Sequence, residues 1–201
     1  MTLREQLTGL STPTGYTLLT PPGWGRFLIT DAGREHAVNL LSTRFKHAGR
    51  PELYAEARAA MHRQWSRLAS SNVQEIFMPI EPQQEGGTPL TIATSPWAAT
   101  GDFEANLRAR VGNGRTVEHR QHPDLGSIFR WVTERDAPDS MPGLKAREVT
   151  SVVPFPGEAP QRGLLIVCSI VHLGVDESGP ALDAFTMLAD AIISTLRWRF
   201  A

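Results

Sequence analysis

The most apolar stretch of the chain lies close to its C-terminal end. Residues 163–173 are apolar at nearly every position, so both faces of a strand formed here would be apolar. An antiparallel strand with one face in water alternates apolar and polar side chains instead. We therefore predict a central strand whose sheet is covered on both faces. A closing helix follows, because apolar residues recur at helical spacing: Leu182, Phe185, Leu188, Ala189, Ile192 and Leu196.

The pattern near the start of the chain predicts two short strands. Residues 15–20 and 24–30 are rich in side chains that favour β-structure, and Pro21-Pro22-Gly23 separates them. Prolines cannot donate to a β-ladder, and glycine permits a turn. We expect a strand, a proline corner and a second strand at the edge of a sheet. Before them, residues 1–14 are polar and are expected to fray, with a short helix over residues 3–10 as the alternative.

Two helices are predicted after these strands. Asp31 can cap a helix over residues 32–48, and Gly49 is typical of the position just after a helix end. Pro51 suits the first turn of a second helix, which we expect to end at residues 70–72. The second helix carries one apolar stripe, which favours packing against a sheet.

The rest of the chain is predicted to form mainly strands. Asp102 can cap one helix among them, over residues 103–111, and Ser95-Pro96-Trp97 is expected to end the strand before it. Residues 122–126 are expected to form the turn of a hairpin, and residues 81–89 and 137–143 to form loops. The predicted strands cover residues 73–80, 90–94, 115–121, 127–135 and 147–155.

This order of elements predicts an α+β fold in a single globular domain over residues 1–201. The strands come in consecutive groups with helices between the groups, which favours a mainly antiparallel sheet over a doubly wound parallel one. With helices on both faces of that sheet, the expected architecture is an α/β/α sandwich. A chain of 201 residues that is 41% hydrophobic and 20% charged suits one such domain.

Three features together resemble the PsbP-like fold group, which includes Ran-binding Mog proteins, DcrB-like proteins and LpqN-type lipoproteins. They are the early Pro21-Pro22-Gly23-Trp24 between two strands, the late run of long strands, and the closing Ile193-Ser194-Thr195-Leu196-Arg197-Trp198. The resemblance implies an α/β/α sandwich that serves as a binding or accessory module rather than an enzyme. It transfers no site residues. The chain lacks the lipobox cysteine near the start, so the lipoprotein form is not expected.

Charge and composition narrow the range of partners. The net charge is −1, so no field of the whole molecule attracts nucleic acid or a membrane surface. Residues 33–72 carry seven cations against three acids, for which a solvated helical face is the favoured interpretation over a binding site. No apolar run approaches the roughly 18 residues of a membrane-spanning helix. We expect a cytoplasmic protein that does not bind a membrane, and nucleic acid is the least favoured partner.

The catalytic patterns that we sought do not occur. The chain has no Gly-x-Ser-x-Gly elbow and no phosphate-binding glycine loop. Cys168, the only cysteine, shares a strand face with His172, but four strand residues separate them by about 13 Å, so a core thiol is favoured. His119 and His122 differ by three residues, which points them to opposite faces of a strand. We predict no catalytic residues, no metal site and no cofactor.

The candidate binding residues are therefore aromatic and polar side chains near strands. Trp24, Trp97, Phe129 and Trp131 are candidates because large aromatic residues are enriched at interfaces. Phe129 and Trp131 share one strand face, with Arg130 opposite; a face under a helix is favoured over an exposed patch. His119, His122 and Glu134 are candidates for lining a pocket.

Two functions remain open from the sequence. The first is a binding or accessory module that acts through protein–protein contact, with an unknown partner or with itself as a homodimer through a sheet edge or an aromatic face. The alternative is a small-molecule-binding protein or an unrecognised hydrolase, with a pocket between sheet and helices near His119, His122 and Glu134.

Overall fold

The computed structural model describes residues 12–47, 49, 52–80, 89–136, 143–156, 161–173 and 179–201. The helix considered over residues 3–10, and nearly all of the loops expected over residues 81–89 and 137–143, lie outside these ranges. The described helices are α2 (Asp31–His47), α3 (Glu52–Ser70), α4 (Phe103–Val111) and α5 (Pro180–Ser194). The described strands are β1 (Gly15–Thr17), β2 (Trp24–Leu28), β3 (Glu75–Pro79), β4 (Leu90–Ala98), β5 (Glu118–His122), β6 (Gly126–Asp136), β7 (Leu144–Pro154), β8 (Arg162–Leu173) and β9 (Arg197–Arg199).

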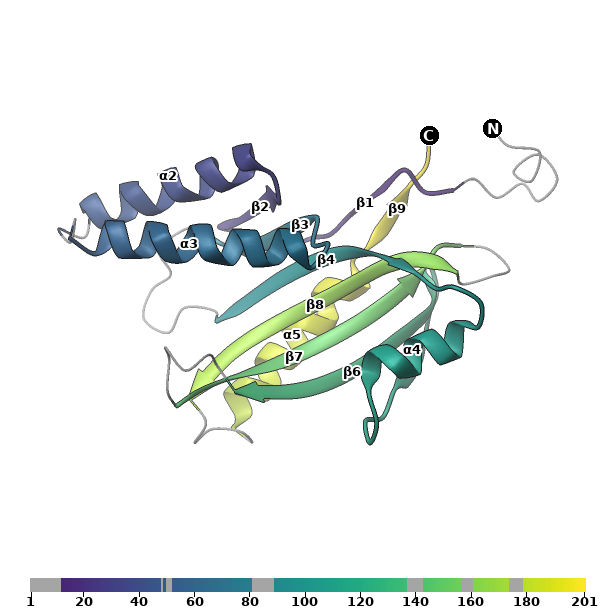
Figure 1. Ribbon diagram of the computed structural model, residues 1–201. Coiled ribbons are helices and arrows are strands. Elements are labelled where there is room, and N and C mark those ends of the chain that lie inside the picture. The colour runs from purple at the N-terminus through teal and green to yellow at the C-terminus, as the bar shows by residue number, and fades with distance from the viewer. Residues whose placement is uncertain are drawn as a thin grey trace.

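Seven of the described strands form one antiparallel sheet, in the order β2-β3-β4-β8-β7-β6-β5. The predicted central strand, β8, occupies the middle of this sheet, and the predicted edge strand, β2, lies at one edge (Figure 1). The α+β class and the antiparallel sheet are therefore confirmed. None of the described helices combines the length and apolarity that a membrane crossing requires.

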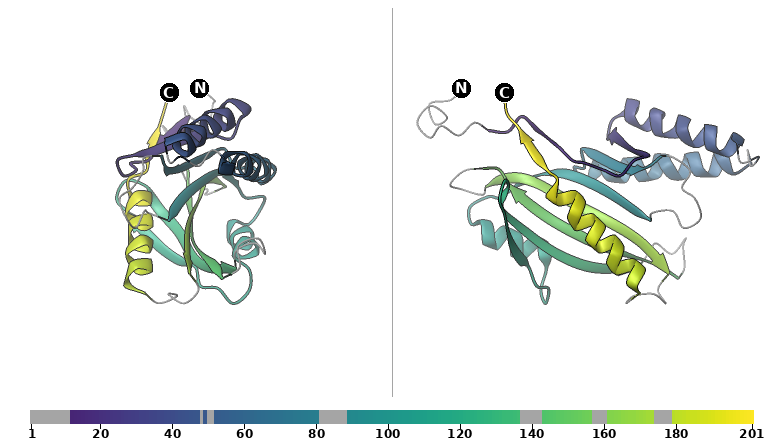
Figure 2. Two further views of the ribbon diagram at one scale, coloured as in Figure 1. Left: turned by 90° about the vertical axis from the view of Figure 1, so that its left-hand side faces the viewer. Right: turned by 180° about the vertical axis from the view of Figure 1, so that it is seen from behind.

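Helices lie on both sides of the sheet (Figure 2). Helix α5 packs on one face, where Ile166, Cys168 and Ile170 of β8 are fully buried. Helix α4 lies on the opposite face, where it covers Leu165 and neighbouring side chains. Alternate residues of β8 therefore enter two separate cores, which explains why this strand is apolar on both faces. Cys168 is a core thiol, as expected, and burial raises its pKa.

Helix α4 begins and ends as its sequence predicts. The Asp102 side chain accepts hydrogen bonds from the backbone N–H groups of Glu104 and Ala105, at 2.8 and 3.3 Å. These are two of the donors that a helix start leaves unpaired. At the other end, Gly112 has a φ of 81°, a left-handed conformation that favours glycine.

Helices α2 and α3 form a hairpin that is anchored at the β2 edge and extends beyond the sheet (Figure 1). Its anchor is a small core of Phe27, Ala37 and Trp65. The Trp65 indole N–H donates to the Thr30 carbonyl at 3.1 Å and so fixes α3 to the end of β2. Gly33 allows the start of α2 to approach closely, because a Cβ there would lie 2.0 Å from the Leu28 carbonyl oxygen.

The prediction that Ser95-Pro96-Trp97 ends a strand was wrong. Strand β4 continues through Pro96, which pairs with Leu164 of β8. The Thr94 carbonyl points away from β8, because it accepts a hydrogen bond from Gln74 just before β3. Pro96 lies two residues after Thr94, so its backbone nitrogen also points away from β8. On that side, no residue of β3 pairs with Pro96. Its missing N–H therefore costs the sheet no hydrogen bond.

The remaining two strands form a separate pair that joins the two ends of the chain. Tyr16 of β1 lies opposite Trp198 of β9, and Gly15 lies opposite Arg199. The Thr14 N–H donates to the Arg199 carbonyl at 2.8 Å and extends the pairing by one residue. No expectation from the sequence placed these two segments together.

Candidate functional site: a pocket between the two sheets

Three of the four aromatic residues singled out from the sequence gather under α4. Trp97, Phe129 and Trp131 belong to one core together with Phe103 of α4, and the two tryptophans are buried. The Phe103 ring lies 6.1 Å from that of Trp97, edge to face, and 4.8 Å from that of Phe129. Phe129 and Trp131 thus form a strand face under a helix. Trp24 lies elsewhere, packed against the core on the α5 side.

The two candidate histidines lie in the β5–β6 hairpin and do not share a site. The His119 ring stacks on Phe129 at 4.9 Å, and its Nε2 lies 2.9 Å from the Ser127 hydroxyl. His122 is near the turn, where its Nδ1 accepts the Asp124 backbone N–H at 3.2 Å. Among the described residues, no group of three or more histidine, cysteine or acidic side chains is arranged to hold a metal ion.

Glu134 lies far along β6 from that turn. Its carboxylate accepts from the Arg147 guanidinium at 2.5 Å and lies 3.1 Å from the His172 Nε2. Arg147 also reaches Asp183 at the start of α5, at 3.3 Å. These contacts connect β6, β7, β8 and α5. The structure therefore does not bring Glu134 together with His119 and His122.

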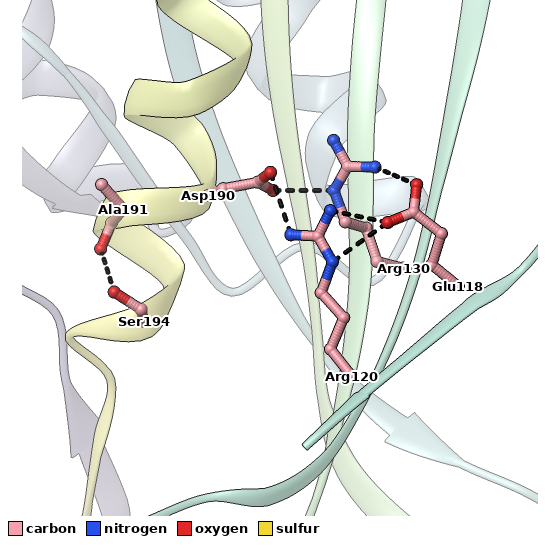
Figure 3. Close-up of polar contacts among 6 residues, drawn as sticks. All are labelled: Glu118, Arg120, Arg130, Asp190, Ala191 and Ser194. Atoms are coloured by element: carbon pink, nitrogen blue, oxygen red, sulfur yellow. Dashed lines mark hydrogen bonds and ion pairs between the residues drawn. The ribbon is translucent and has the colours of Figure 1, made fainter. Parts of the chain in front are cut away.

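Four charged side chains form a closed ring between α5 and the β5–β6 hairpin (Figure 3). Arg130 is buried and donates to both Asp190 and Glu118 at 2.7 Å. Arg120, which is more exposed, contacts the same two acids at 3.0 and 2.6 Å. The ring holds two cations and two anions, so its net charge is zero. Its partners satisfy one another, which is typical of a structural clamp and not of a binding site.

A pocket of about 250 Å³ lies between the β1–β9 pair and one end of the large sheet. Residues from β1, β2, β3, β4, β8 and β9 contribute to its walls, so segments from both ends of the chain meet there. None of the residues chosen from the sequence lines it. The lining consists of Pro13, Thr14, Gly15, Tyr16, Arg26, Gln74, Glu75, Pro96, Phe155, Gly163, Leu164, Trp198 and Arg199.

One wall of the pocket is a hydrogen-bonded network around Glu75, a buried carboxylate of β3. Arg26 forms a bidentate pair with it, with Nε at 3.0 Å from Oε2. The Tyr16 hydroxyl donates to the same oxygen at 2.5 Å and lies 2.7 Å from the Thr94 hydroxyl. Since Tyr16 has one proton and gives it to Glu75, Thr94 is the donor in that second bond.

This network fixes the charge state of the wall. Burial raises the pKa of Tyr16, and its hydrogen bond to Glu75 raises it further, so the phenol is neutral at physiological pH. Hydrogen bonding to Glu75 raises the pKa of Arg26. Arg26 and Glu75 therefore neutralise each other. Two of the five Arg26 donors are used on Glu75, and no described residue accepts from the other three.

Arg199 is the other cation of the lining and has no acidic partner in the described part of the chain. Its guanidinium lies against the backbone of Gly15, where a Cβ would stand 2.8 Å from one terminal nitrogen. Glycine at this position therefore allows the guanidinium to lie flat across β1. Arg199 is exposed, so water solvates this positive charge, which no described residue compensates.

Another part of the lining is aromatic and apolar. The Trp198 and Phe155 rings meet edge to face, 4.9 Å apart, with Leu164 and Pro96 beside them. The Trp198 indole N–H is buried and has no acceptor among the described residues. Arg162 stands outside the lining, with its guanidinium 5.6 Å from the Phe155 ring.

Sequence reasoning missed this pocket because β1 and β9 are far apart along the chain. The alternation Arg197-Trp198-Arg199 near the C-terminus was a usable signal, since it places an aromatic residue between two cations. Nothing in that pattern shows which segment it faces. Comparison with protein-family models and with curated protein sequences finds no match to this chain.

Proposed function

We propose that this chain is a binding module whose pocket between the two sheets takes a small anion. The observation that carries the proposal is Arg199, an uncompensated cation in a concave site. Arg199 is exposed and forms no ion pair with a described residue, so its guanidinium can donate charged hydrogen bonds to an anion without breaking an existing contact. The Glu75 network supports the site by holding Arg26 and Tyr16 in fixed positions.

Binding is favoured over catalysis by the state of the groups in the lining. Tyr16 and Glu75 are the side chains there that could exchange protons, and they are hydrogen-bonded to each other. The raised pKa of Tyr16 keeps it from acting as a base near neutral pH. The described lining contains no serine, cysteine or histidine that could act as a nucleophile or base.

The test is calorimetric titration of the protein with acetate, benzoate, sulfate and inorganic phosphate. We expect at least one anion to bind with a stoichiometry of one. Arg199→Gln should weaken that binding about tenfold or more, since a charged hydrogen bond contributes about 1.5–3 kcal/mol. Arg110→Gln, an exposed arginine of α4 outside the lining, is the matched control. No binding by any of the four anions, or equal binding by Arg199→Gln, would contradict the proposal.

Protein–protein contact is a second candidate, supported by an exposed apolar part of the sheet. Val171 and Leu173 are 43% and 58% exposed and lie on the same face of β8, on the α4 side. Leu144 of β7 pairs with Leu173 and continues this surface. Self-association through it predicts a solution mass that rises with concentration and that Leu173→Asp reduces. A wild-type protein that stays monomeric at every concentration tested by light scattering would exclude it.

We also propose that the fold is an α/β/α sandwich of the PsbP-like kind. The order of elements, the antiparallel sheet and the helices on its two sides support this assignment. The accessory role that the resemblance implies agrees with a binding module. A superposition of an experimental structure on members of that group is the test, and a different strand order would contradict the assignment.

A further inference from the structure

We infer that the outward side of α5 is an interface between two copies of this chain, which pack with their α5 helices antiparallel about a twofold axis. This inference goes beyond the proposed anion site and does not depend on it. Three properties of α5 lead to it: an exposed stripe without charge, an order of large and small side chains that fits its own copy, and opposite charges at the two ends of the helix.

The stripe of α5 that points away from the sheet carries no charge. The charged residues of α5 are Asp183 and Asp190, and both pair with arginines of the sheet along one flank. The outward stripe consists of five exposed residues at helical spacing: Pro180, Ala184, Met187, Ala191 and Ser194. Figure 3 shows Ala191 on the side of α5 away from Arg130. The Ser194 hydroxyl donates to the Ala191 carbonyl at 2.7 Å, so it needs no outside partner.

The other described helices behave differently on their exposed sides. Helices α2, α3 and α4 expose charged side chains, among them Glu35, Arg63 and Arg108. Charged and polar residues normally occupy the side of a helix that water contacts. Their absence from the outward stripe of α5 indicates that another surface covers this stripe.

Large apolar side chains are exposed at the middle and at the end of α5. Met187, in the outward stripe, is 72% exposed. Leu19 is 71% exposed and lies beside the C-terminal end of α5, because its backbone N–H donates to the Thr195 hydroxyl at 2.9 Å. Exposed apolar surface of this kind is typical of an interaction site.

The order of large and small side chains in the stripe fits a second copy of itself. Met187 and Ala191 lie equally far from the midpoint of the stripe, and so do Ala184 and Ser194. When two α5 helices pack antiparallel at this midpoint, Met187 of each copy therefore lies opposite Ala191 of the other. Each large side chain meets a small one, and the twofold axis makes this contact occur twice.

The charges at the ends of α5 favour the same antiparallel arrangement. Asp183 lies in the first turn and is exposed. At the other end, the exposed Arg197 guanidinium donates to the Ser194 carbonyl at 3.2 Å. Since Ala184 of one copy lies opposite Ser194 of the other, Asp183 of each copy comes close to Arg197 of the other. Such charge complementarity favours the correct pairing, whereas a parallel pair would bring like charges together.

A second copy suits this stripe better than a lipid surface does. Helices that lie in a membrane surface carry lysine and arginine on their polar side. The charged residues of α5 are both aspartates, which an anionic lipid surface repels. We therefore commit to the second copy as the occupant of the stripe.

The first test is the mass of the intact chain by sedimentation equilibrium, from about 1 μM to about 1 mM. One helix from each copy, roughly 22 Å long, makes an interface at the small end of the usual range, so the dimer should be weak. We expect the mass to rise from one chain to two and to stop there, because a twofold interface is closed.

Two matched variants locate the interface. Met187→Asp should raise the dissociation constant of the dimer at least tenfold, because it places a charge from each copy in an apolar contact. Leu173→Asp, which changes the exposed apolar surface on the other side of the sheet, should leave the dissociation constant unchanged. Both side chains are more than half exposed, and melting temperatures establish that both variants are folded.

Disulfide cross-linking tests the antiparallel orientation. Ala184→Cys and Ser194→Cys proteins, mixed and oxidised, should form a cross-link between the two different variants. Neither variant should cross-link to itself, because equal positions lie about 15 Å apart along an antiparallel pair, and a disulfide requires Cα atoms within about 7 Å. The native Cys168 is fully buried and does not compete.

The contrary outcomes are distinct. A chain that stays monomeric up to about 1 mM overturns the inference. So does a dimer that Leu173→Asp dissociates and Met187→Asp does not, which would assign self-association to the sheet. Cross-links within each single variant overturn the antiparallel arrangement. A monomer that binds phosphatidylcholine vesicles through Met187 would assign the stripe to a lipid surface instead. None of these results bears on the anion site, which Arg199→Gln tests separately.

Discussion

The charge ring in Figure 3 makes a prediction about two arginines that contact the same two acids in different surroundings. The Arg130 side chain is 6% exposed, whereas that of Arg120 is 43% exposed. Asp190 accepts from Arg130 Nε at 2.7 Å and joins α5 to β6. Removing Asp190 should therefore destabilise the fold much more than removing Arg120, although each change deletes one member of the ring.

The expected magnitudes follow from burial. Asp190→Ala removes a charged hydrogen bond from the buried Arg130 guanidinium, which costs about 1.5–3 kcal/mol. The cost is not higher because Glu118 still contacts Arg130. Arg120→Met removes exposed ion pairs, which contribute about 0–1 kcal/mol. The double variant Glu118→Ala with Asp190→Ala leaves the buried Arg130 without a carboxylate in this ring, and about 3–5 kcal/mol is expected.

Urea denaturation followed by circular dichroism measures these differences. The slope of the free energy of unfolding against urea should be the same in every variant, so that changes in midpoint report stability. A loss below about 0.5 kcal/mol for Asp190→Ala, or an equal loss for Arg120→Met, would refute the argument that burial decides the value of these ion pairs.

Three further predictions concern the core and the pocket wall. Tyr16→Phe should cost about 1–3 kcal/mol at neutral pH, because it removes the hydroxyl that Glu75 and Thr94 share. The same variant should lose less stability than wild type in urea titrations above pH 10. Above pH 10 the tyrosine of the unfolded chain, with a pKa of about 10, loses its proton. Folded Tyr16 keeps its proton because its pKa is raised. The free energy of unfolding of wild type therefore falls by up to about 1.4 kcal/mol per pH unit from this group. Parallel pH dependences for the two proteins would contradict the buried-phenol argument. Phe103→Ala should cost about 3–5 kcal/mol, since it uncovers Trp97 and Phe129; a loss near zero would show that α4 does not stabilise this core.

The elements that the sequence predicts correctly are those set by local patterns. The two apolar faces of β8 predict a central strand, and Asp102 with Gly112 marks both ends of α4. Pro96 misled the prediction because the cost of a proline depends on whether the neighbouring strand needs its N–H. That information lies in the length of β3, which is 5 residues, and not in the residues around Pro96.

The pocket was beyond prediction for a related reason. It depends on the pairing of Gly15 with Arg199, two residues at opposite ends of the chain. The hydrogen-bond partner of Glu75 is also distant along the chain, since Tyr16 precedes it by 59 residues. The candidates chosen from local context, such as Trp97 and Trp131, proved to be buried under α4. As binding residues, all seven candidates remain predictions.

The most direct test of the binding proposal is a crystal structure of the protein grown with the anion that binds most tightly in the calorimetric titration. The account predicts one anion at the pocket, within hydrogen-bonding distance of the Arg199 guanidinium. A ligand bound at another surface, or a pocket closed by its own side chains at saturating ligand, would contradict it.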